Sequence, residues 1–496
     1  MKIKLILPRF TRAQATGPRP IKYSLWPPIG LAALAGHAAA DDDVWIEDEN
    51  VEALHLDDDP DIVGISTYVS SASRAYEIAD HYRARRVHVA LGGLHATAMP
   101  AEALEHADTV FLGPADNTWP RFLEDLRGRV ARRIYRSQAR SLDDQPPVRR
   151  DLIKRHRYLV PDSLVVSRGC PHKCDFCSNS SFFRGGPAFY TQPVDQALSE
   201  LDRLPGRNLY FLDDHIFGDV AFARALFGAM RGMGRTWQSA ATVDSAFHTD
   251  LLDLAVESGL RALLVGFETM SDANLKCHRK HQNLGRDYSE AVRRFHDAGV
   301  MVNATFVFGL DDDDEDVFDR TVAWALEQGI ETATFHILTP YPGTGPYQRM
   351  AAEGRVLTRN WDLYDTAHVV FRPARMSVAQ LKEGYLRACR DFYRWGSILK
   401  SAGVHRRLRD RVRHFAYTAG WGRFDRTWDA MIRTGQVRLL SPLLASLLAS
   451  GGAGIAGSAG EREPARVKGT GRREAHTGGR VRRVELPLAG PGGRLR

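Results

Sequence analysis

Cysteine is scarce in this sequence, and the first third of the chain has none. The chain holds 5 cysteines in 496 residues, and none of them precedes Cys170. So few cysteines argue against a secreted protein held together by disulfides and fit a reducing compartment. We therefore expect a cytoplasmic protein.

Long apolar runs and secretion signals are missing as well. The most apolar late segment, LLSPLLASLLAS (439–450), is interrupted by Pro442 and is too short to span a membrane. The opening MKIKLILP has the pattern of a strand and lacks a small-residue cleavage site. The sequence thus predicts neither a transmembrane segment nor a signal peptide.

The distribution of charge gives no support to a nucleic-acid-binding protein. Residues 451–496 hold ten Lys and Arg against four Asp and Glu, from a whole-chain net charge of +7. Their Gly-rich composition, poor in large apolar residues, predicts a disordered basic tail. The folded part is then close to neutral, so nucleic-acid binding has no support.

The few cysteines that are present form the most informative motif. SRGCPHKCDFCSNS places Cys170, Cys174 and Cys177 in a C-x3-C-x2-C run directly after the apolar SLVVS. Three thiolates on one loop can hold three irons of a 4Fe–4S cluster, which leaves the fourth iron open to a small chelating molecule. The alternative is a structural zinc knuckle, which needs a fourth ligand such as His172.

Apolar runs alternate with helical patterns after the cysteines, at intervals of about thirty residues, which indicates parallel βαβ units. The expected strands are 163–169, 209–214, 237–243, 262–268, 301–309 and 332–338, with expected helices at 194–204, 219–230 and 288–299. Six such units predict a partial (β/α)6 barrel whose active-site residues lie at the carboxyl ends of the strands.

A cysteine loop that leaves the first strand of a six-stranded barrel resembles the radical S-adenosylmethionine (SAM) superfamily. The resemblance implies that the cysteines hold the cluster and that SAM binds its open iron. It also implies contacts to SAM from the other strand ends and from the cysteine loop. These SAM-binding candidates are Phe176, Asp213, Asp214, Glu268 and Gly309. Glu268 would bond the ribose or methionine part, and Gly309 would let the adenine approach the backbone. Asp213 and Asp214 stand where the superfamily often has Gly-Gly-Glu.

The first 135 residues show a second α/β pattern with short strands. KIKLILP, VWIED, DIVGIST, VHVALGG and TVFLG alternate with helical segments, one of them from about Ser73 to Arg85. This order predicts a doubly wound, flavodoxin-like domain that binds its ligand beyond the carboxyl ends of the strands. No G-x-G-x-x-G follows the first strand, so a dinucleotide site of the Rossmann type lacks support.

PPIGLAALA, GIST and GGLH at these places resemble the cobalamin-binding domain that is fused to some radical SAM cores. The resemblance places Ser66, Thr67 and Tyr68 near the lower face of the corrin, and Gly92 and Gly93 along the nucleotide tail. The Asp-x-His-x-x-Gly motif, whose histidine ligates cobalt, is absent. His95 is a poor substitute, because a metal ligand needs an orienting partner. Methylthiotransferases, which hold a second cluster in this region, are excluded because it contains no cysteine.

We expect four regions: residues 1–135, the cobalamin-binding domain; 155–345, the radical SAM core; 346–450, mostly helical; and the tail 451–496. In 346–450, Trp361 and Tyr364 either wall a substrate pocket or pack in the core. The resemblance implies a C-methyltransferase acting on a small-molecule or natural-product substrate, with a 4Fe–4S cluster, SAM and cobalamin as cofactors. Its electron donor would be a flavodoxin or ferredoxin. A cobalamin-dependent cyclase or rearrangement enzyme, and a non-catalytic cobalamin-binding module, are the alternatives.

Overall fold

A computed structural model of the chain describes residues 1–10, 25–423 and 441–449, together with four single positions between the last two ranges. The tail expected at residues 451–496 lies outside the described residues.

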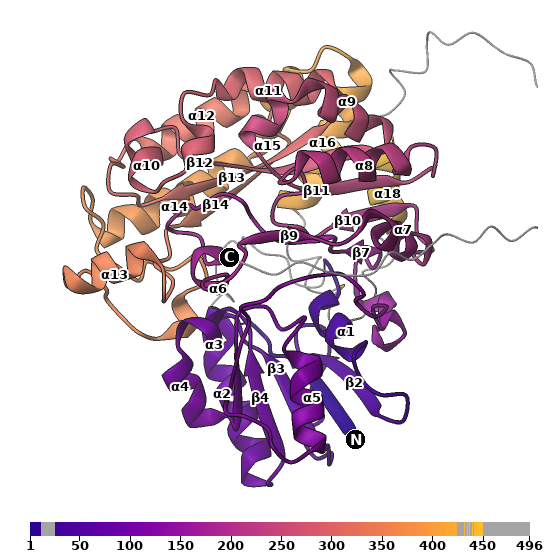
Figure 1. The fold of residues 1–496 in the computed structure, drawn as a ribbon. Coiled ribbons are helices and arrows are strands. Elements are labelled where there is room, and N and C mark those ends of the chain that lie inside the picture. Colours follow the sequence, from indigo (N-terminus) through magenta and orange to yellow (C-terminus); the bar gives the residue numbers. More distant parts are fainter. Residues whose placement is uncertain are drawn as a thin grey trace, which may run out of the picture. The chain divides into compact units, whose positions relative to one another are not determined.

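Six parallel strands form the first sheet, in the order β2-β1-β3-β4-β5-β6 (Figure 1). The order 2-1-3-4-5 is that of flavodoxin-like folds, so the expected doubly wound domain is confirmed. The short edge strand β6 was not expected. The elements are β1 (Lys2–Leu7), α1 (Ile29–Ala35), β2 (Asp43–Asp48), β3 (Ile62–Ser66), α2 (Ala72–Ala84), β4 (His88–Gly92), α3 (Leu94–Ala98), α4 (Pro100–His106), β5 (Thr109–Leu112), α5 (Trp119–Arg127) and β6 (Ile134–Arg136).

Helices cover both faces of this sheet because its strands are apolar on both sides. Ile6, Val63 and their neighbours on one face pack with α2, α3 and α4. Ile3, Leu5 and their neighbours on the other face pack with α1 and α5. Parallel sheets are commonly buried in this way.

The second sheet is also entirely parallel, in the order β14-β13-β12-β11-β10-β7. Sequential strands are neighbours with helices between them, so the expected partial (β/α)6 barrel is confirmed. Its elements are β7 (Ser163–Leu164), β8 (Ser167–Gly169), α6 (Asn179–Phe182), β9 (Phe189–Thr191), α7 (Val194–Asp202), β10 (Asn208–Phe211), α8 (Val220–Met230), β11 (Thr236–Thr242), α9 (Thr249–Glu257), β12 (Leu260–Glu268), α10 (Asp272–Cys277), α11 (Tyr288–Asp297), β13 (Met301–Phe308), α12 (Val317–Glu327), β14 (Thr332–Ile337) and α13 (Gly345–Ala352).

The expected first strand, residues 163–169, is divided in two. Only β7 joins the barrel sheet, whereas β8 pairs antiparallel with β9 in a separate ribbon. Between them, the backbone N–H groups of Val166 and Ser167 donate to the carboxylate of Asp213 instead of to a neighbouring strand. The cysteine loop therefore leaves the two-stranded ribbon and not the barrel sheet itself.

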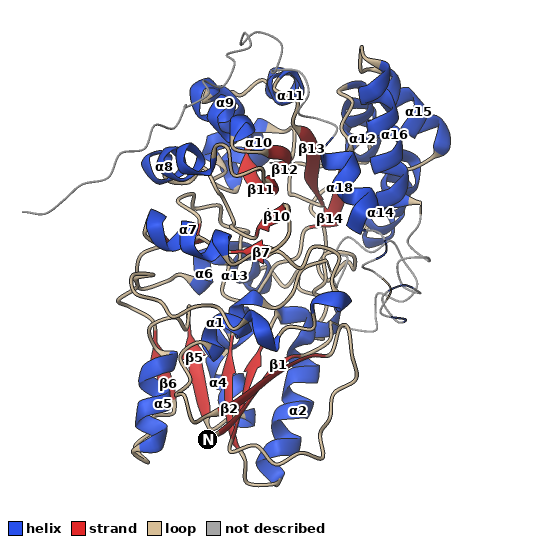
Figure 2. Cartoon of the chain, turned by 90° about the vertical axis from the view of Figure 1, so that its right-hand side faces the viewer, coloured by secondary structure: helices blue, strands red, loops and turns tan. Residues whose placement is uncertain are grey.

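Helices dominate the region after the barrel, as expected (Figure 2). They are α14 (Val378–Phe392), α15 (Trp395–Gly403), α16 (Leu408–Gly422) and α18 (Ser441–Ala449). Helices α14 and α16 lie against β14, and α18 contacts both α16 and β12. Among the described residues, no helix is long and apolar enough to cross a membrane.

The segment between α13 and α14 packs partly on the barrel, whose core includes Phe371 and Met376, and partly on the first domain. Trp361 and Tyr364 are 6% and 1% exposed and belong to the apolar cluster that holds Ile6 and Val63. The indole N–H of Trp361 donates to Glu102 on α4 at 3.0 Å. Both aromatic residues are thus core packing, one of the two alternatives that the sequence left open.

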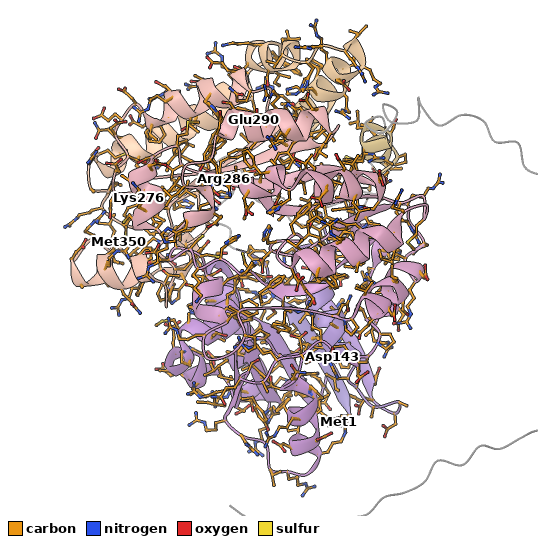
Figure 3. All side chains as sticks on the ribbon, turned by 45° about the horizontal axis from the view of Figure 1, so that its top comes forward. Met1, Asp143, Lys276, Arg286, Glu290 and Met350 are labelled. Carbon is orange, nitrogen blue, oxygen red and sulfur yellow. The ribbon has the colours of Figure 1, made fainter. Side chains whose placement is uncertain are left out.

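Charged side chains lie on the outer helices and on the loop before α11, as Figure 3 shows for Lys276, Glu290 and Arg286. Glu290 pairs with Arg294 one helical turn away on α11, at 2.7 Å. Pairs of this kind at i and i+4 contribute about 0.3–0.5 kcal/mol each, so they add to solubility more than to stability.

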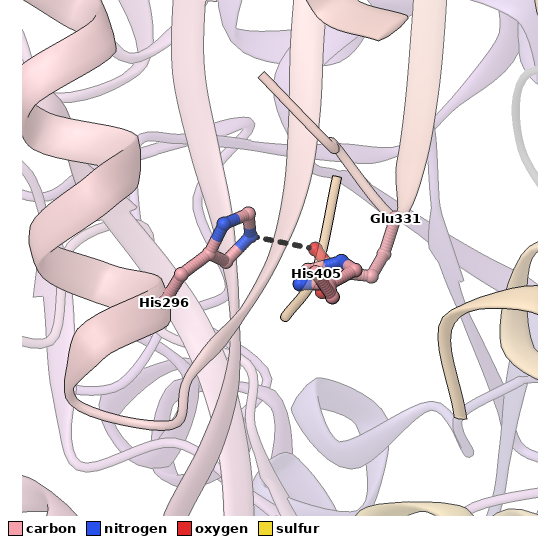
Figure 4. Close-up of side chains that lie close together, drawn as sticks. All are labelled: His296, Glu331 and His405. Carbon is pink, nitrogen blue, oxygen red and sulfur yellow. Dashed lines mark hydrogen bonds and ion pairs between the residues drawn. The ribbon is translucent and has the colours of Figure 1, made fainter. Parts of the chain in front are cut away.

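A buried cluster of histidines ties the C-terminal helices to the barrel (Figure 4). Nε2 of His296 lies 3.2 Å from the Glu331 carboxylate, and Nε2 of His405 lies 3.8 Å from it. His405 also bonds Nδ1 of His414 at 3.0 Å. Burial lowers the pKa of His405 and lowers the pKa of His414 to about 4, so both rings are neutral at pH 7.

This cluster predicts a loss of stability in acid. The pKa of His414 is lower in the folded chain, at about 4, than the 6.5 of a free histidine. Its contribution to folding is therefore complete above about pH 6.5 and is lost as the pH falls toward 4, by about 3 kcal/mol for this one ring. Urea unfolding at pH 7 and pH 4.5 should show a smaller difference for His414→Gln than for the unchanged protein. His281→Gln, at an exposed ring, should leave the difference unaltered; an unaltered difference in His414→Gln would contradict the assignment.

Candidate functional site

The cysteine loop, residues 170–178, joins β8 to α6 and is held from two sides. The carboxylate of Asp175 accepts from Nδ1 of His278, after α10, and from Nη1 of Arg349 on α13, both at 2.8 Å. The amide of Gln282 donates to Sγ of Cys174 at 3.4 Å. The loop is therefore fixed by contacts to distant parts of the barrel.

The three thiols fit a metal cluster. Cys174 is 8% exposed, and Cys170 and Cys177 are half-buried. Burial, with the nearby charge of Asp214, raises the pKa of Cys170 to about 11 and that of Cys177 to about 12. Ionising three adjacent buried thiols requires a strong positive charge among them, which iron supplies and which displaces the protons.

A buried lysine lies beside the cysteines. Lys280 is 5% exposed, and its ammonium group pairs with the Glu268 carboxylate at 3.2 Å. Burial alone would lower the pKa of Lys280, but the charges of Glu268, Cys174 and Cys177 outweigh it and raise the pKa. Lys280 thus links the cysteine loop to the end of β12.

Glu268 occupies a strained backbone position at that strand end. Its φ is +65°, a left-handed conformation that non-glycine residues rarely adopt, and the β12–β13 register shifts between Gly266 and Glu268. The carboxylate folds back so closely that a Cβ on Gly266 would come within 2.5 Å of it. It also accepts from the hydroxyl of Thr305 at 3.3 Å. Strain of this kind accumulates at functional sites, where the surrounding structure maintains it.

The Glu268–Lys280 pair predicts a specific pattern of stability. The two side chains are 14% and 6% exposed. Lys280→Met leaves a buried carboxylate unpaired, so we expect unfolding to become easier by about 3–5 kcal/mol. Adding Glu268→Gln should restore most of that loss, because the side chain left at position 268 then carries no charge. A Lys280→Met protein within 1 kcal/mol of the unchanged protein in urea unfolding would contradict this role.

The two aspartates after β10 have different surroundings. Asp213 is 3% exposed and accepts from the backbone N–H groups of Val166 and Ser167, so it shapes the entry to the cysteine loop. Burial raises its pKa to about 6. Asp214 is exposed, bonds the side chain of Asn179 in α6, and acts by its charge on Cys170 and Cys177. Of the two, Asp214 has the surface to meet a ligand.

Phe176 and Gly309 lie at the same end of the barrel but are tied into packing. Phe176 is half-buried, with its ring 5.7 Å from that of His278. Gly309 has φ +88°, and a Cβ there would meet Leu381 of α14 at 2.8 Å. Glycine is therefore required at 309 by the fit of α14, whether or not an adenine approaches the other side.

The cobalamin-binding candidates converge at the ends of β3 and β4. Ser66 and Gly92 are register partners and both are half-buried. Thr67 is fully buried, and its backbone bonds Gly92 and His95. Gly93 has φ +101°, and a Cβ there would come within 2.8 Å of the Thr67 carbonyl oxygen. Thr67 and Gly93 therefore build the turn, while Ser66 and Gly92 border the space beyond the strands where such folds bind ligands.

Tyr68 follows β3 in the first domain and is 41% exposed. Burial, and then the charge of Asp214 from the barrel, raise its pKa. Arg168, just before the loop, bonds Asp116 of the first domain at 2.9 Å and so adds a direct link. The charge of Asp214 thus acts on candidate site residues of both domains.

His95 is buried in the first domain. It is 0% exposed, Nε2 pairs with Glu102 at 3.1 Å, and its ring lies 5.2 Å from that of Trp361. His95 is therefore a core residue with a carboxylate partner, and not the polar loop residue without an orienting partner that the sequence suggested.

Sequence reasoning missed the segment from His278 to Asn283. Its residues His278, Lys280 and Gln282 contact the cysteine loop or Glu268. A chemical signal could have found these residues, because three adjacent thiolates need a cation nearby. The run RKHQ (279–282) is basic, ends in an amide, and follows the strand-end carboxylate Glu268 and a short helix.

Comparison with family models and known proteins gives a consistent result. Residues 23–123 match the B12 binding domain, and residues 164–340 match the radical SAM superfamily. Bacteriochlorophyllide d C-12(1)-methyltransferase of Chlorobaculum tepidum is 28% identical over 353 residues, which cover 68% of this chain and 76% of that protein.

Two solved structures have the same fold. The cobalamin-dependent S-adenosylmethionine radical enzyme OxsB, with aqua-cobalamin and S-adenosylmethionine bound, superposes with a TM-score of 0.62 at 13% identity, covering 90% of this chain and 75% of that one. The radical S-adenosylmethionine methyltransferase TsrM of Kitasatospora setae, with cobalamin and a [4Fe-4S] cluster bound, gives 0.55 at 14% identity, covering 88% and 99%.

Proposed function

Because the chain belongs to the radical SAM enzymes that carry a B12-binding domain, we propose that it is a methyltransferase acting on an unactivated carbon of a small-molecule or natural-product substrate. Cobalamin, SAM and a 4Fe–4S cluster are the cofactors that these two domains bring. When bound, the cluster and SAM supply a 5′-deoxyadenosyl radical that takes a hydrogen atom from the substrate, and cobalamin supplies the methyl group.

One observation carries the proposal: Arg168, directly before the cysteine loop, bonds Asp116 of the first domain at 2.9 Å, and the charge of Asp214 acts on Cys170, Cys177 and Tyr68. The cysteine loop therefore lies next to the first domain. Methyl transfer to a carbon radical requires both groups within reach of the same substrate atom, and this placement supports it.

The residues of the chain would bind the cofactors and orient them. Cys170, Cys174 and Cys177 would hold three irons. Glu268, paired with Lys280, would accept hydrogen bonds from SAM, and Asp214 would accept from the SAM amino group. Ser66, Tyr68, Gly92 and Gly93 would border cobalamin, with Thr67 supporting their turn. A reduced flavodoxin or ferredoxin would supply the electron.

The test uses protein reconstituted anaerobically with iron, sulfide and hydroxocobalamin. After SAM and a strong reductant are added, we expect both 5′-deoxyadenosine and S-adenosylhomocysteine, since one SAM yields the radical and another remethylates the cobalt. Deoxyadenosine without S-adenosylhomocysteine, in the presence of a consumed substrate, would indicate a cyclase or rearrangement enzyme. Cobalt bound without iron would refute the radical reaction and leave a cobalamin-binding module.

A further inference from the structure

The barrel encloses a large cavity that none of the cofactors accounts for. Its volume is about 870 Å³, within the range of sites that hold a whole small molecule. One wall is the inner face of the sheet, where alternate residues of β12, β13 and β14 remain partly accessible while their neighbours are buried. The opposite wall consists of α16 and α18, with further apolar residues before the barrel.

The wall is apolar and carries no formal charge. Leu264 on the sheet faces Phe415 on α16 and Leu444 and Leu447 on α18 across the cavity, and among the described lining residues there is no Asp, Glu, Lys or Arg. The SAM sulfonium and amino acid groups, and the amide-rich edge of cobalamin, would lose their hydration here without compensation. The cavity therefore suits a neutral molecule.

Several polar groups of the wall already have hydrogen-bond partners within the chain. Thr332 donates to Asn303, and Asn303 donates to the hydroxyl of Tyr417. His336 bonds the hydroxyl of Thr366 at 2.9 Å, and burial lowers its pKa, so that it is neutral. Thr334 adds a hydroxyl to the same wall. An occupant would thus meet an apolar surface with a few hydroxyl and amide positions.

At the carboxyl ends of the strands, which we call its upper end, the cavity adjoins the candidate SAM-binding residue Glu268. Thr305 lines the cavity and donates to Glu268 at 3.3 Å. His336, one strand further, lies close enough to Glu268 to experience its charge. The lower end reaches the beginnings of the strands, where Ala262 and Met301 pack with Leu448 of α18. A molecule lying along the barrel would bring one end to Glu268.

We propose that this cavity binds the methyl acceptor and that the acceptor is a neutral, largely apolar small molecule, held between the sheet and helices α16 and α18 with its reacting end beside Glu268. This inference rests on the proposed function for the reaction, but the cavity and its chemistry stand independently of it. A charged acceptor, such as a phosphorylated or nucleotide-linked one, is excluded from this space by the cost of burying its charge.

Nile red, a neutral apolar dye, tests the inference on the anaerobic holoenzyme. We expect one site per chain with increased fluorescence. Ala416→Trp fills the cavity from α16 and Thr334→Trp fills it from the sheet, and each should weaken dye binding by at least about tenfold, or 1.4 kcal/mol. Leu408→Trp is the matched control, because Leu408 lies on the same helix as Ala416 but is 75% exposed; its dye binding should equal that of the unchanged protein.

Two results would overturn the inference. One is dye binding of unchanged affinity in both tryptophan variants when their iron and cobalt contents are normal. The other is absence of dye binding in unchanged protein that cleaves SAM, which would mean that the space is filled by the chain itself. Failure of the proposed function is recognised separately: the unchanged protein would bind the dye but form neither 5′-deoxyadenosine nor S-adenosylhomocysteine.

Discussion

Cys174→Ala should remove the iron–sulfur cluster and abolish formation of 5′-deoxyadenosine while leaving cobalt binding intact. Cys174 is one of three thiols on the loop and, at 8% exposed, the most buried of them. Loss of a group that merely supports a metal ligand costs about 10–100-fold, so loss of the ligand itself should exceed a hundredfold. Cobalt should remain because the candidate cobalamin contacts, such as Ser66 and Gly92, lie at the ends of β3 and β4 and not on the cysteine loop.

The measurement is iron and cobalt per chain after reconstitution, followed by chromatography of 5′-deoxyadenosine. Cys277→Ala is the matched control, because Cys277 is exposed at the end of α10 and should keep full iron and full product. Iron in Cys174→Ala close to that of the unchanged protein would show that these thiols do not form the ligand set.

Asp213→Ala should destabilise the fold strongly. The carboxylate accepts from two buried backbone N–H groups, at 2.6 Å from Ser167 and 3.2 Å from Val166, and from the Ser167 hydroxyl. Each buried donor left without a partner costs about 1–3 kcal/mol, so we expect about 3–5 kcal/mol in all. Because these bonds set the path into the cysteine loop, iron content should fall as well.

Urea unfolding followed by circular dichroism, with iron content in parallel, checks this expectation. Asp214→Ala is the stability control, since its carboxylate is exposed and its removal should cost less than about 1 kcal/mol. Equal stability of the two variants would mean that Asp213 does not support the loop. Asp213 would then remain only a candidate SAM-binding residue.

The role of Asp213 illustrates where sequence reasoning ends. A carboxylate at the end of a barrel strand has the pattern of a ligand contact, and nothing local distinguishes it from Asp214 next to it. The distinction depends on Val166 and Ser167, more than forty residues earlier, whose N–H groups have no strand partner. The same break divides the apolar run 163–169, which periodicity alone describes as one strand.

Features carried by local pattern were predictable. The cysteine spacing, the alternation of strands and helices, and both sheet classes follow from short-range sequence, because each strand and helix shows its own period. Lys280 was not predictable, since its partners Glu268 and Cys174 lie 12 and 106 positions earlier. Gly309 was placed correctly at a strand end, but the observed reason for the glycine is contact with Leu381, a residue from a helix beyond the barrel.

Because Trp361 and Tyr364 are buried in the first domain, the packing of that domain is completed only late in synthesis of the chain. Residues 1–136 leave the ribosome with all six strands of their sheet, but the apolar cluster on one face is completed only by side chains made over two hundred residues later. At about 5–20 residues per second, the part of the cluster that Trp361 and Tyr364 cover stays exposed for about ten to fifty seconds, although α2, α3 and α4 already lie on that face. A truncated chain that stops after β6 would keep this apolar part exposed permanently.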